Sequence, residues 1–146
     1  MTIQVLVAGK PSLRFAQLGM EEYLKRLRRL AKLELVVLKA GASEVVSRAL
    51  LERSEGTCRI ALDERGEAWN TEDLVKRVNE WEMDPGIKTV SLLIGASDGH
   101  TEELRKRCDA VWALSPMTMQ HELALVVLLE QVYRVFTIKR GEPYHR

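Results

Sequence analysis

Residues 95–99 (GASDG) combine two features that suit a ligand site. They follow residues 88–94 (KTVSLLI), an apolar run typical of a buried strand, and they precede a stretch with a helix-start pattern. Glycines let a ligand approach the backbone closely, and the N–H groups at a helix start point towards it. The GxGxxG pattern and the lysine of a phosphate-binding loop are missing, which disfavours a dinucleotide or a nucleoside triphosphate. A purely structural turn explains the same spacing.

A second candidate is the segment 114–119 (LSPMTM), which is unusually apolar for a loop. Two methionines and a proline suit the wall of a pocket for a flat, partly apolar ligand, with backbone groups supplying the polar contacts. The alternative is a loop that packs on the core. His121 follows at the start of a long apolar stretch, where we expect it either to cap a helix or to border the pocket.

The other histidines and the two cysteines give weaker signals. His100 stands at a helix start, where we expect it to be exposed and without a role. His145 lies in the polar tail 140–146 (RGEPYHR), which by itself is typical of a frayed end. Cys58 and Cys108 match neither CxxC nor zinc spacing, so we expect buried reduced thiols and no metal cofactor.

Basic residues concentrate at the two ends of the chain, although the net charge is only +1. Residues 1–32 carry seven Lys and Arg against two Glu, and residues 134–146 carry four against one. Four basic residues at helical spacing predict a basic stripe on one helix face: Lys25, Arg28, Arg29 and Lys32. Clustered Lys and Arg favour a polyanionic partner, and a solvated helix face is the alternative.

Strand-like and helix-like segments alternate five times along the chain. Short apolar runs predict strands at 3–8, 33–38, 58–62, 88–94 and 110–114. Apolar residues at three- and four-residue spacing predict helices at 12 to about 32, 43–53, 71 to about 83, from about 101, and 121–138. We expect Ser43 and Thr71 to cap their helices, and residues 63–66 to form a polar turn.

This alternation predicts an α/β protein with a largely parallel sheet and flanking helices. Ligands of such sheets bind beyond the carboxyl ends of the strands, which directs attention to the turns at Asp63, Gly95 and Ser115. The last helix is apolar on nearly all sides, so another surface must cover its second face.

Length and composition limit the class of protein. The 146 residues suffice for one domain, residues 1–146, with one ordinary hydrophobic core. Hydrophobic residues make up 46% and charged residues 29%, which argues against disordered and fibrous classes. The apolar run at 123–129 is far shorter than a membrane span, and residues 1–9 do not form a secretory signal. We therefore expect a cytoplasmic protein without membrane contacts.

A series of short motifs runs in order along the whole chain. They are GK at 9–10, EYLKRL at 22–27, LDERG at 62–66, LLIG at 92–95, MT at 117–118, His121, EQVYR at 130–134 and RGEPYHR at 140–146. Together they resemble the motifs of the bacterial ribosomal RNA large subunit methyltransferase H family. The strand-end Ile-Gly, the downstream Tyr-Arg and the terminal Tyr-His-Arg form a specific combination.

The resemblance implies a SPOUT-class enzyme that uses S-adenosylmethionine to methylate N3 of a pseudouridine in a stem-loop of the 23S rRNA. It implies a homodimer that acts on assembled ribosomes, and an α/β fold whose C-terminal segment is threaded into a trefoil knot. Periodicity cannot predict a knot, because knotted connections are rare. The family's cofactor-binding positions correspond here to Leu62, Gly95, Leu114, Ser115, Pro116, Met117, Thr118 and Met119.

The resemblance also turns the C-terminal tail into a candidate source of catalytic groups. We expect His145 to accept the N3 proton, because imidazole titrates near neutral pH. Tyr144 would stack on the target base, while Arg140 and Arg146 would hold phosphates or stabilise the imide anion. The alternative is that the tail only orders RNA and solvent takes the proton. In a dimer, the tail of one subunit would reach the pocket of its partner.

Three positions depart from the family's usual pattern. Ala96 stands in place of a second glycine, Gln120 in place of a proline and Leu125 in place of an arginine. Two other classes of function stay open at this point. One is a non-catalytic RNA-binding or ribosome-assembly module, and the other is a related methyltransferase acting on tRNA or on a ribose hydroxyl.

Overall fold

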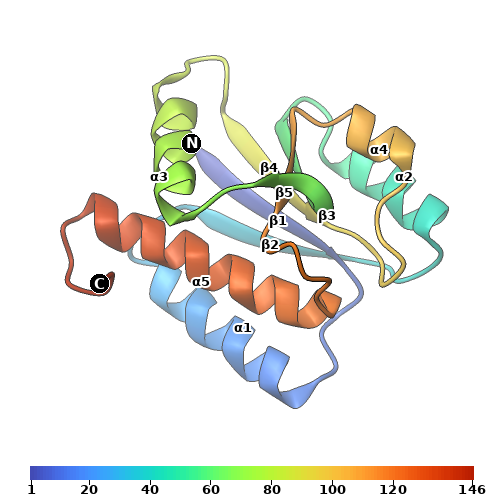
Figure 1. Ribbon diagram of the computed structural model, residues 1–146, viewed down its shortest axis with the longest axis horizontal. Helices are drawn as coiled ribbons and strands as arrows, with labels where there is room; N and C mark the ends of the chain where they lie inside the picture. The colour runs from blue at the N-terminus through green and yellow to red at the C-terminus, as the bar shows by residue number, and fades with distance from the viewer.

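The computed structural model describes residues 1–146. It contains one sheet of five parallel strands, which helices cover on both faces (Figure 1). The sheet order is β2-β1-β4-β3-β5, and every pairing is parallel. The elements are β1 (Thr2–Ala8), α1 (Arg14–Leu27), β2 (Leu33–Leu38), α2 (Ser43–Arg53), β3 (Cys58–Ala68), α3 (Thr71–Met83), β4 (Thr89–Ile94), α4 (Glu102–Lys106), β5 (Ala110–Ala113) and α5 (His121–Lys139). The predicted fold class is confirmed.

Alternate residues of the central strands face opposite helix layers, as the period of two along a strand requires. Val5 and Val7 of β1 lie in the larger core, which α1, α3 and α5 cover. Leu6 and Ala8 of the same strand lie in the smaller core beneath α2 and α4. Figure 1 shows the same division, with α1, α3 and α5 together on one side of the sheet and α2 and α4 on the other.

The second surface predicted over the last helix is confirmed. α5 packs on the sheet and also against α1 and α3 (Figure 1). Gly19 of α1 makes a close approach possible, because a Cβ there would lie 2.9 Å from a methyl carbon of Val126. The hydroxyl of Thr71 at the start of α3 donates to the side-chain oxygen of Gln131 at 2.8 Å. No helix is long and apolar enough to cross a membrane.

The predicted polar turn at residues 63–66 is wrong, because β3 continues through it to Ala68. Beyond Leu62 the strand pairs again with β5 after a register shift, with Glu67 opposite the same Trp112. Gly66 permits this second pairing, since a Cβ there would lie 2.4 Å from the carbonyl oxygen of Val111. Charged residues are tolerated in this part of the strand because Glu64, Arg65 and Glu67 are exposed, while the buried Asp63 carboxylate lies beside Arg65 and Arg105.

Two predicted helix caps are also wrong. The hydroxyl of Ser43 donates to the carbonyl of Gly99 at 2.6 Å instead of capping α2. Asn70, rather than Thr71, caps α3, and its side-chain oxygen accepts from the N–H of Asp73 at 2.8 Å. The Asp73 carboxylate accepts from the Asn70 N–H in return, which completes a capping box.

The predicted basic stripe does not form one helix face, because α1 ends at Leu27. Arg28 is the C-cap, and Arg29 and Lys32 lie beyond the helix, so only the first stripe residue is helical. The chain closes into a tight turn here, where the N–H of Leu30 donates to the Leu27 carbonyl at 2.9 Å.

The two cysteines are free and half-buried, a lower burial than predicted. Burial raises the pKa of both Cys58 and Cys108 to about 11. Both side chains are therefore protonated thiols at neutral pH, which makes them poor nucleophiles.

Candidate functional site

The carboxyl ends of β4 and β5, together with residues 62–65 in the middle of β3, border one partly open cavity of about 200 Å³. These three strands are neighbours in the sheet, so the cavity lies at the edge where ligands of parallel sheets bind. Seven of the eight predicted cofactor positions line the cavity: Leu62, Gly95, Leu114, Ser115, Met117, Thr118 and Met119. Pro116 does not line it. His121 borders the cavity, which is one of the two alternatives predicted for it.

The turn after β4 forms one wall of the cavity. Gly95 lies directly against the imidazole of His100, and a Cβ at this position would be 2.8 Å from the ring atom Nδ1. The N–H of Gly99 donates to the Ala96 carbonyl at 2.8 Å, which closes the turn, and Gly99 has a φ of 88°. The two glycines therefore have different roles, close contact at Gly95 and a left-handed backbone at Gly99.

His100 is buried, with an exposed fraction of 5%, so the prediction of an exposed histidine is wrong. The turn folds back and places the ring under Gly95, where Nε2 donates to the Leu93 carbonyl at 3.0 Å. Nδ1 is therefore an acceptor, and it is buried without a hydrogen-bond partner. Burial lowers the pKa of His100, so the ring is neutral at pH 7. An unpaired acceptor in the wall of a cavity suits a ligand that carries a donor.

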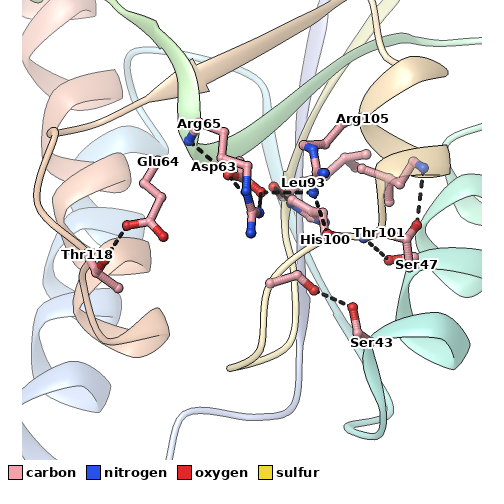
Figure 2. Close-up of polar contacts among 12 residues, drawn as sticks. Ser43, Ser47, Asp63, Glu64, Arg65, Leu93, His100, Thr101, Arg105 and Thr118 are labelled. Atoms are coloured by element: carbon pink, nitrogen blue, oxygen red, sulfur yellow. Dashed lines mark hydrogen bonds and ion pairs between the residues drawn. The ribbon is translucent and has the colours of Figure 1, made fainter.

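Asp63 is a pocket residue whose burial the sequence did not indicate. Its side chain is 4% exposed and accepts from the backbone N–H of Arg65 at 2.9 Å. The Arg105 guanidinium lies 3.8 Å from the carboxylate and donates to the His100 carbonyl at 2.6 Å. Figure 2 shows these side chains gathered between β3 and α4. The position of Asp63 directly after the apolar run of β3 was the available signal.

A contact across the cavity joins β3 to the apolar loop. The hydroxyl of Thr118 donates to the carboxylate of Glu64, and Figure 2 shows the two side chains facing each other. Within the loop, the N–H of Met117 donates to the hydroxyl of Ser115 at 3.0 Å. The side chain of Met117 is 75% exposed, so the loop presents apolar surface at the cavity rather than packing on the core.

The predicted catalytic tail lies at the opposite end of α5 from the cavity. The helix has 19 residues, which separates its ends by roughly 27 Å. Figure 1 shows the C-terminus beside the far end of α5. The predicted pocket residues lie together at one end of α5, and the predicted tail residues lie together at the other end. Within one chain the two groups are not in contact.

Polar and aromatic contacts hold the tail against α1 and α5. The Arg29 guanidinium binds the Glu142 carboxylate at 2.8 Å. The hydroxyl of Tyr144 donates to Glu130 at 3.4 Å and lies 3.3 Å from the hydroxyl of Tyr23. Burial and the Tyr23 contact raise the pKa of Tyr144, so its hydroxyl stays protonated at neutral pH. Tyr144 is thus committed to contacts within its own chain.

The predicted RNA-binding residues lie near this tail, but some of them are already hydrogen-bonded within the chain. Lys25, Arg28 and Lys32 are exposed. Arg29 is occupied by Glu142, and Arg140 donates to the Arg29 carbonyl at 3.1 Å.

The three departures from the family pattern have distinct structural outcomes. Gln120 caps α5, because its side-chain oxygen accepts from the N–H groups of Glu122 and Leu123, each at 2.9 Å. Leu125 is a core residue with an exposed fraction of 1%, so it makes no polar contact. Ala96 lines the cavity beside Gly95. No group of three or more His, Cys, Asp or Glu side chains is placed to hold a metal ion.

Parallel α/β topology with a partly apolar pocket at the strand ends places the chain among ligand-binding α/β proteins. One solved structure with this fold is the tRNA (m1G37) methyltransferase from Aquifex aeolicus. It is 15% identical, with a TM-score of 0.59 over 100% of this chain and 75% of that chain, which is a likeness of fold alone.

A family model described as "Predicted SPOUT methyltransferase" matches residues 1–145. Relatives named ribosomal RNA large subunit methyltransferase H match the full length. One such protein from Thermus thermophilus is 44% identical over 100% of this chain and 99% of its own, and that from Deinococcus deserti is 39% identical over 100% of both. A protein from Pseudomonas paraeruginosa is 31% identical over 100% of both. The chain belongs to the SPOUT methyltransferases, in the ribosomal RNA large subunit methyltransferase H family.

Proposed function

We propose that this methyltransferase transfers a methyl group from S-adenosylmethionine to N3 of a pseudouridine in a stem-loop of 23S rRNA on assembled, cytoplasmic ribosomes. Family membership supports methyl transfer, and the names of the full-length relatives support a large-subunit rRNA substrate. The observation that carries the proposal is the cavity at the carboxyl ends of β4 and β5 and the middle of β3, which seven of the eight expected positions line.

The residues of the cavity fit S-adenosylmethionine. Gly95 lets the His100 ring pack directly against the backbone of the cavity wall, and the buried Nδ1 of that ring is an acceptor without a donor. Leu114, Met117 and Met119 supply apolar surface for a flat ring system. When bound, the cofactor supplies a methyl group on a positively charged sulfur. The Glu64 carboxylate, which lines the cavity, is favourable for a cation, whereas Asp63 is already paired with Arg65 and Arg105.

The reaction requires alignment of N3 of the base, the methyl carbon and the sulfur. It requires no covalent bond to the protein. N3 of the target base releases its proton, its electron pair forms the new N–C bond, and the pair of the broken C–S bond stays on sulfur. Positioning such reactants supplies a large share of the reduction in barrier. The pocket residues would hold the donor in place while His145 and Arg146 of the tail would contact the target base. Tyr144, whose ring and hydroxyl pack within its own chain, would hold these two residues in position.

A homodimer would bring pocket and tail together. One chain keeps them apart by the length of α5, so a complete site needs the tail of a partner. Apolar side chains at the N-terminal ends of α1 and α5 remain uncovered: Leu13, Phe15, Leu18 and Leu123 are 40%, 52%, 50% and 39% exposed. Such a surface favours burial against a second copy. The trefoil knot stays a prediction.

Basic side chains near the tail would contact the RNA backbone. Lys25, Arg28 and Lys32 are exposed and available to phosphates. Arg29 and Arg140 are engaged with the tail, so in this conformation they order it instead. The basic surface and the tail therefore form one continuous region at the C-terminal end of α5.

The test is methyl transfer from labelled S-adenosylmethionine to ribosomes that lack the modification, with mass spectrometry to locate the product. Label on the base of a pseudouridine is the expected result. Label on a ribose or on tRNA would replace the proposed substrate. Binding to ribosomes without any cofactor binding would identify a non-catalytic assembly module and overturn the proposal.

A further inference from the structure

The contact between Arg134 and His145 restricts what the histidine can do. Nη1 of Arg134 lies 3.1 Å from Nδ1 of His145. A guanidinium carries only donors and keeps its proton in proteins, so Arg134 must donate in this hydrogen bond. Nδ1 of His145 is therefore the acceptor, and the ring proton of the neutral imidazole lies on Nε2. That nitrogen makes no hydrogen bond within the chain, and the side chain of His145 is exposed.

Arg134 is itself held rigidly. Its Nε and Nη2 atoms bind Oε1 of Glu130 at 2.8 and 2.6 Å, which leaves Nη1 for His145. Its guanidinium also lies over the ring of Tyr144, with 4.8 Å between the guanidinium carbon and the ring centroid. The ring of Tyr144 in turn packs edge-on against Tyr133, with centroids 4.7 Å apart. The guanidinium of Arg134 thus connects α5 to the last residues of the tail.

We propose that Arg134 is a positioning residue that docks the C-terminal tail and makes His145 a hydrogen-bond donor at Nε2 instead of the proton acceptor. The proposal rests on the proposed function, because it assigns a role towards the target base. The Nδ1 lone pair, which a base would need, is occupied by a permanent cation. A proton added at Nδ1 would break this bond and place two cations side by side.

An Nε2–H donor fits the chemistry of a uracil-type imide. Loss of the N3 proton spreads negative charge over the two flanking carbonyl oxygens, and a donor aimed at one of them stabilises that charge. The proton itself then passes to solvent water, and N3 keeps the electron pair that forms the bond to the methyl carbon. His145 returns unchanged, with its own proton still on Nε2.

The first experiment measures the tail without any activity. In uniformly ¹⁵N-labelled protein, we expect the Nδ1 resonance of His145 to be that of an unprotonated acceptor, and its Nε2 to be protonated. The backbone amides of Tyr144 and His145 should be rigid on the nanosecond timescale, and R134Q should release them. Arg53→Gln on α2 is the matched control, because Arg53 is exposed and forms no ion pair. Tail amides that stay rigid in R134Q would overturn the docking role.

The second experiment separates donor from proton acceptor. Glutamine keeps an N–H donor near the position of Nε2 but cannot accept a proton at neutral pH, whereas alanine does neither. Removal of a donor of this kind costs about 100-fold in kcat, so we expect that loss in H145A and a loss below about 10-fold in H145Q. Equal losses in H145Q and H145A would overturn the donor role and restore the proton acceptor.

The third experiment tests whether the simultaneous hydrogen bonds of the Arg134 guanidinium to Glu130 and His145 matter, in single-turnover assays on ribosomes. Lysine carries the charge but cannot bind Glu130 through two nitrogens and His145 at the same time. We expect R134K and R134Q to lower kcat together by about 10-fold or more while the Kd for S-adenosylmethionine is unchanged. Full rescue by R134K would show that charge alone matters and would contradict the proposal. If the wild-type enzyme methylates no pseudouridine, the proposed function fails. The NMR data then test on their own whether Arg134 donates to His145 and docks the tail.

Discussion

The two ends of α5 differ in how far their polar groups are satisfied. At the N-terminal end, the wall of the cavity contains a buried acceptor without a partner, Nδ1 of His100, whose ring packs directly against Gly95. At the C-terminal end, Arg29, Arg134 and Tyr144 all have partners inside the chain. Unpaired buried groups are costly, and one in the wall of a cavity can be satisfied by a ligand that carries a donor. The first end is therefore shaped for a ligand, and the second holds a tail in a fixed conformation.

The difference suggests why this enzyme would need two copies of its chain. Binding groups and candidate catalytic groups occupy opposite ends of one rigid helix, so no bending of the tail's last residues can bring them together. The tail of a partner chain can complete the pocket without a conformational change at either end of α5. The predictions below test the two ends separately, from the largest expected effect to the smallest.

The largest effect is expected from Gly95→Ala at the pocket end. The added Cβ would lie 2.8 Å from Nδ1 of His100 and would displace the wall of the cavity. Overpacking of this kind costs about 1–3 kcal/mol, so we expect the Kd for S-adenosylmethionine to rise about 10- to 100-fold in calorimetry. Gly41→Ala is the control, because nothing lies within 4 Å of its Cβ position. An unchanged Kd in Gly95→Ala would show that the clash with His100 does not reach the binding cavity.

At the tail end, reversal of Lys25 and Lys32 to glutamate should weaken ribosome binding. Each lost phosphate contact lowers the slope of log K against log[salt] by about 1, so the double variant should lower it by about 2. Affinity for S-adenosylmethionine should be unchanged, since neither residue lines the cavity. An unchanged salt slope would remove both lysines from the RNA-binding surface.

A smaller, pH-dependent effect is expected from Glu122→Gln at the pocket end. The Glu122 carboxylate accepts from the N–H groups of Leu13 and Ser12 at 3.0 and 2.6 Å, and these bonds lower its pKa. A carboxyl whose pKa is lower in the folded protein contributes stability above its unfolded pKa and loses it as the pH falls. We expect the variant to be about 1 kcal/mol less stable at pH 7 by urea unfolding. The difference should begin to shrink as the pH falls below about 4.3 and should disappear only below the lowered pKa of Glu122; a difference that does not shrink over this range would contradict the charge-based origin.

The smallest effect is expected from Tyr144→Phe. The hydrogen bonds of this hydroxyl are long, at 3.3 and 3.4 Å, and the ring contacts with Tyr133 and Arg134 remain in the variant. We expect a loss of stability below about 1 kcal/mol and a tail that stays docked. A released tail in this variant would show that the hydroxyl, rather than the ring and Arg134, fixes the docked conformation.

The fold could be predicted from local patterns because each strand and helix carries its own period. The apolar runs at β1 and β4 are buried on both faces, and the spacing in α5 matched a helix covered on more than one side. The pocket was predictable for the same reason, since parallel strands end at one edge. The extension of β3 through Asp63 and Gly66 was not, because it depends on a close approach to β5 rather than on residue type.

The errors at His100 and in the tail have a common origin in contacts between distant segments. His100 is buried because its turn folds back over Leu93, and a histidine that follows Gly99 at a helix start looks like a surface residue in sequence. The tail is ordered by pairs such as Arg29 and Glu142, which lie 113 positions apart. Local composition describes the tail as frayed, and only the fold brings these partners together.

The central claim is that the pocket of one chain works with the tail of its partner, and mixed dimers test it most directly. Gly95→Ala disables the pocket and H145A disables the tail, so each homodimer should methylate ribosomes poorly. A mixed dimer would retain one site built from an intact pocket and an intact tail. Random reassembly should therefore restore about a quarter of the wild-type number of sites. Activity that remains at the level of the two separate variants would contradict the account.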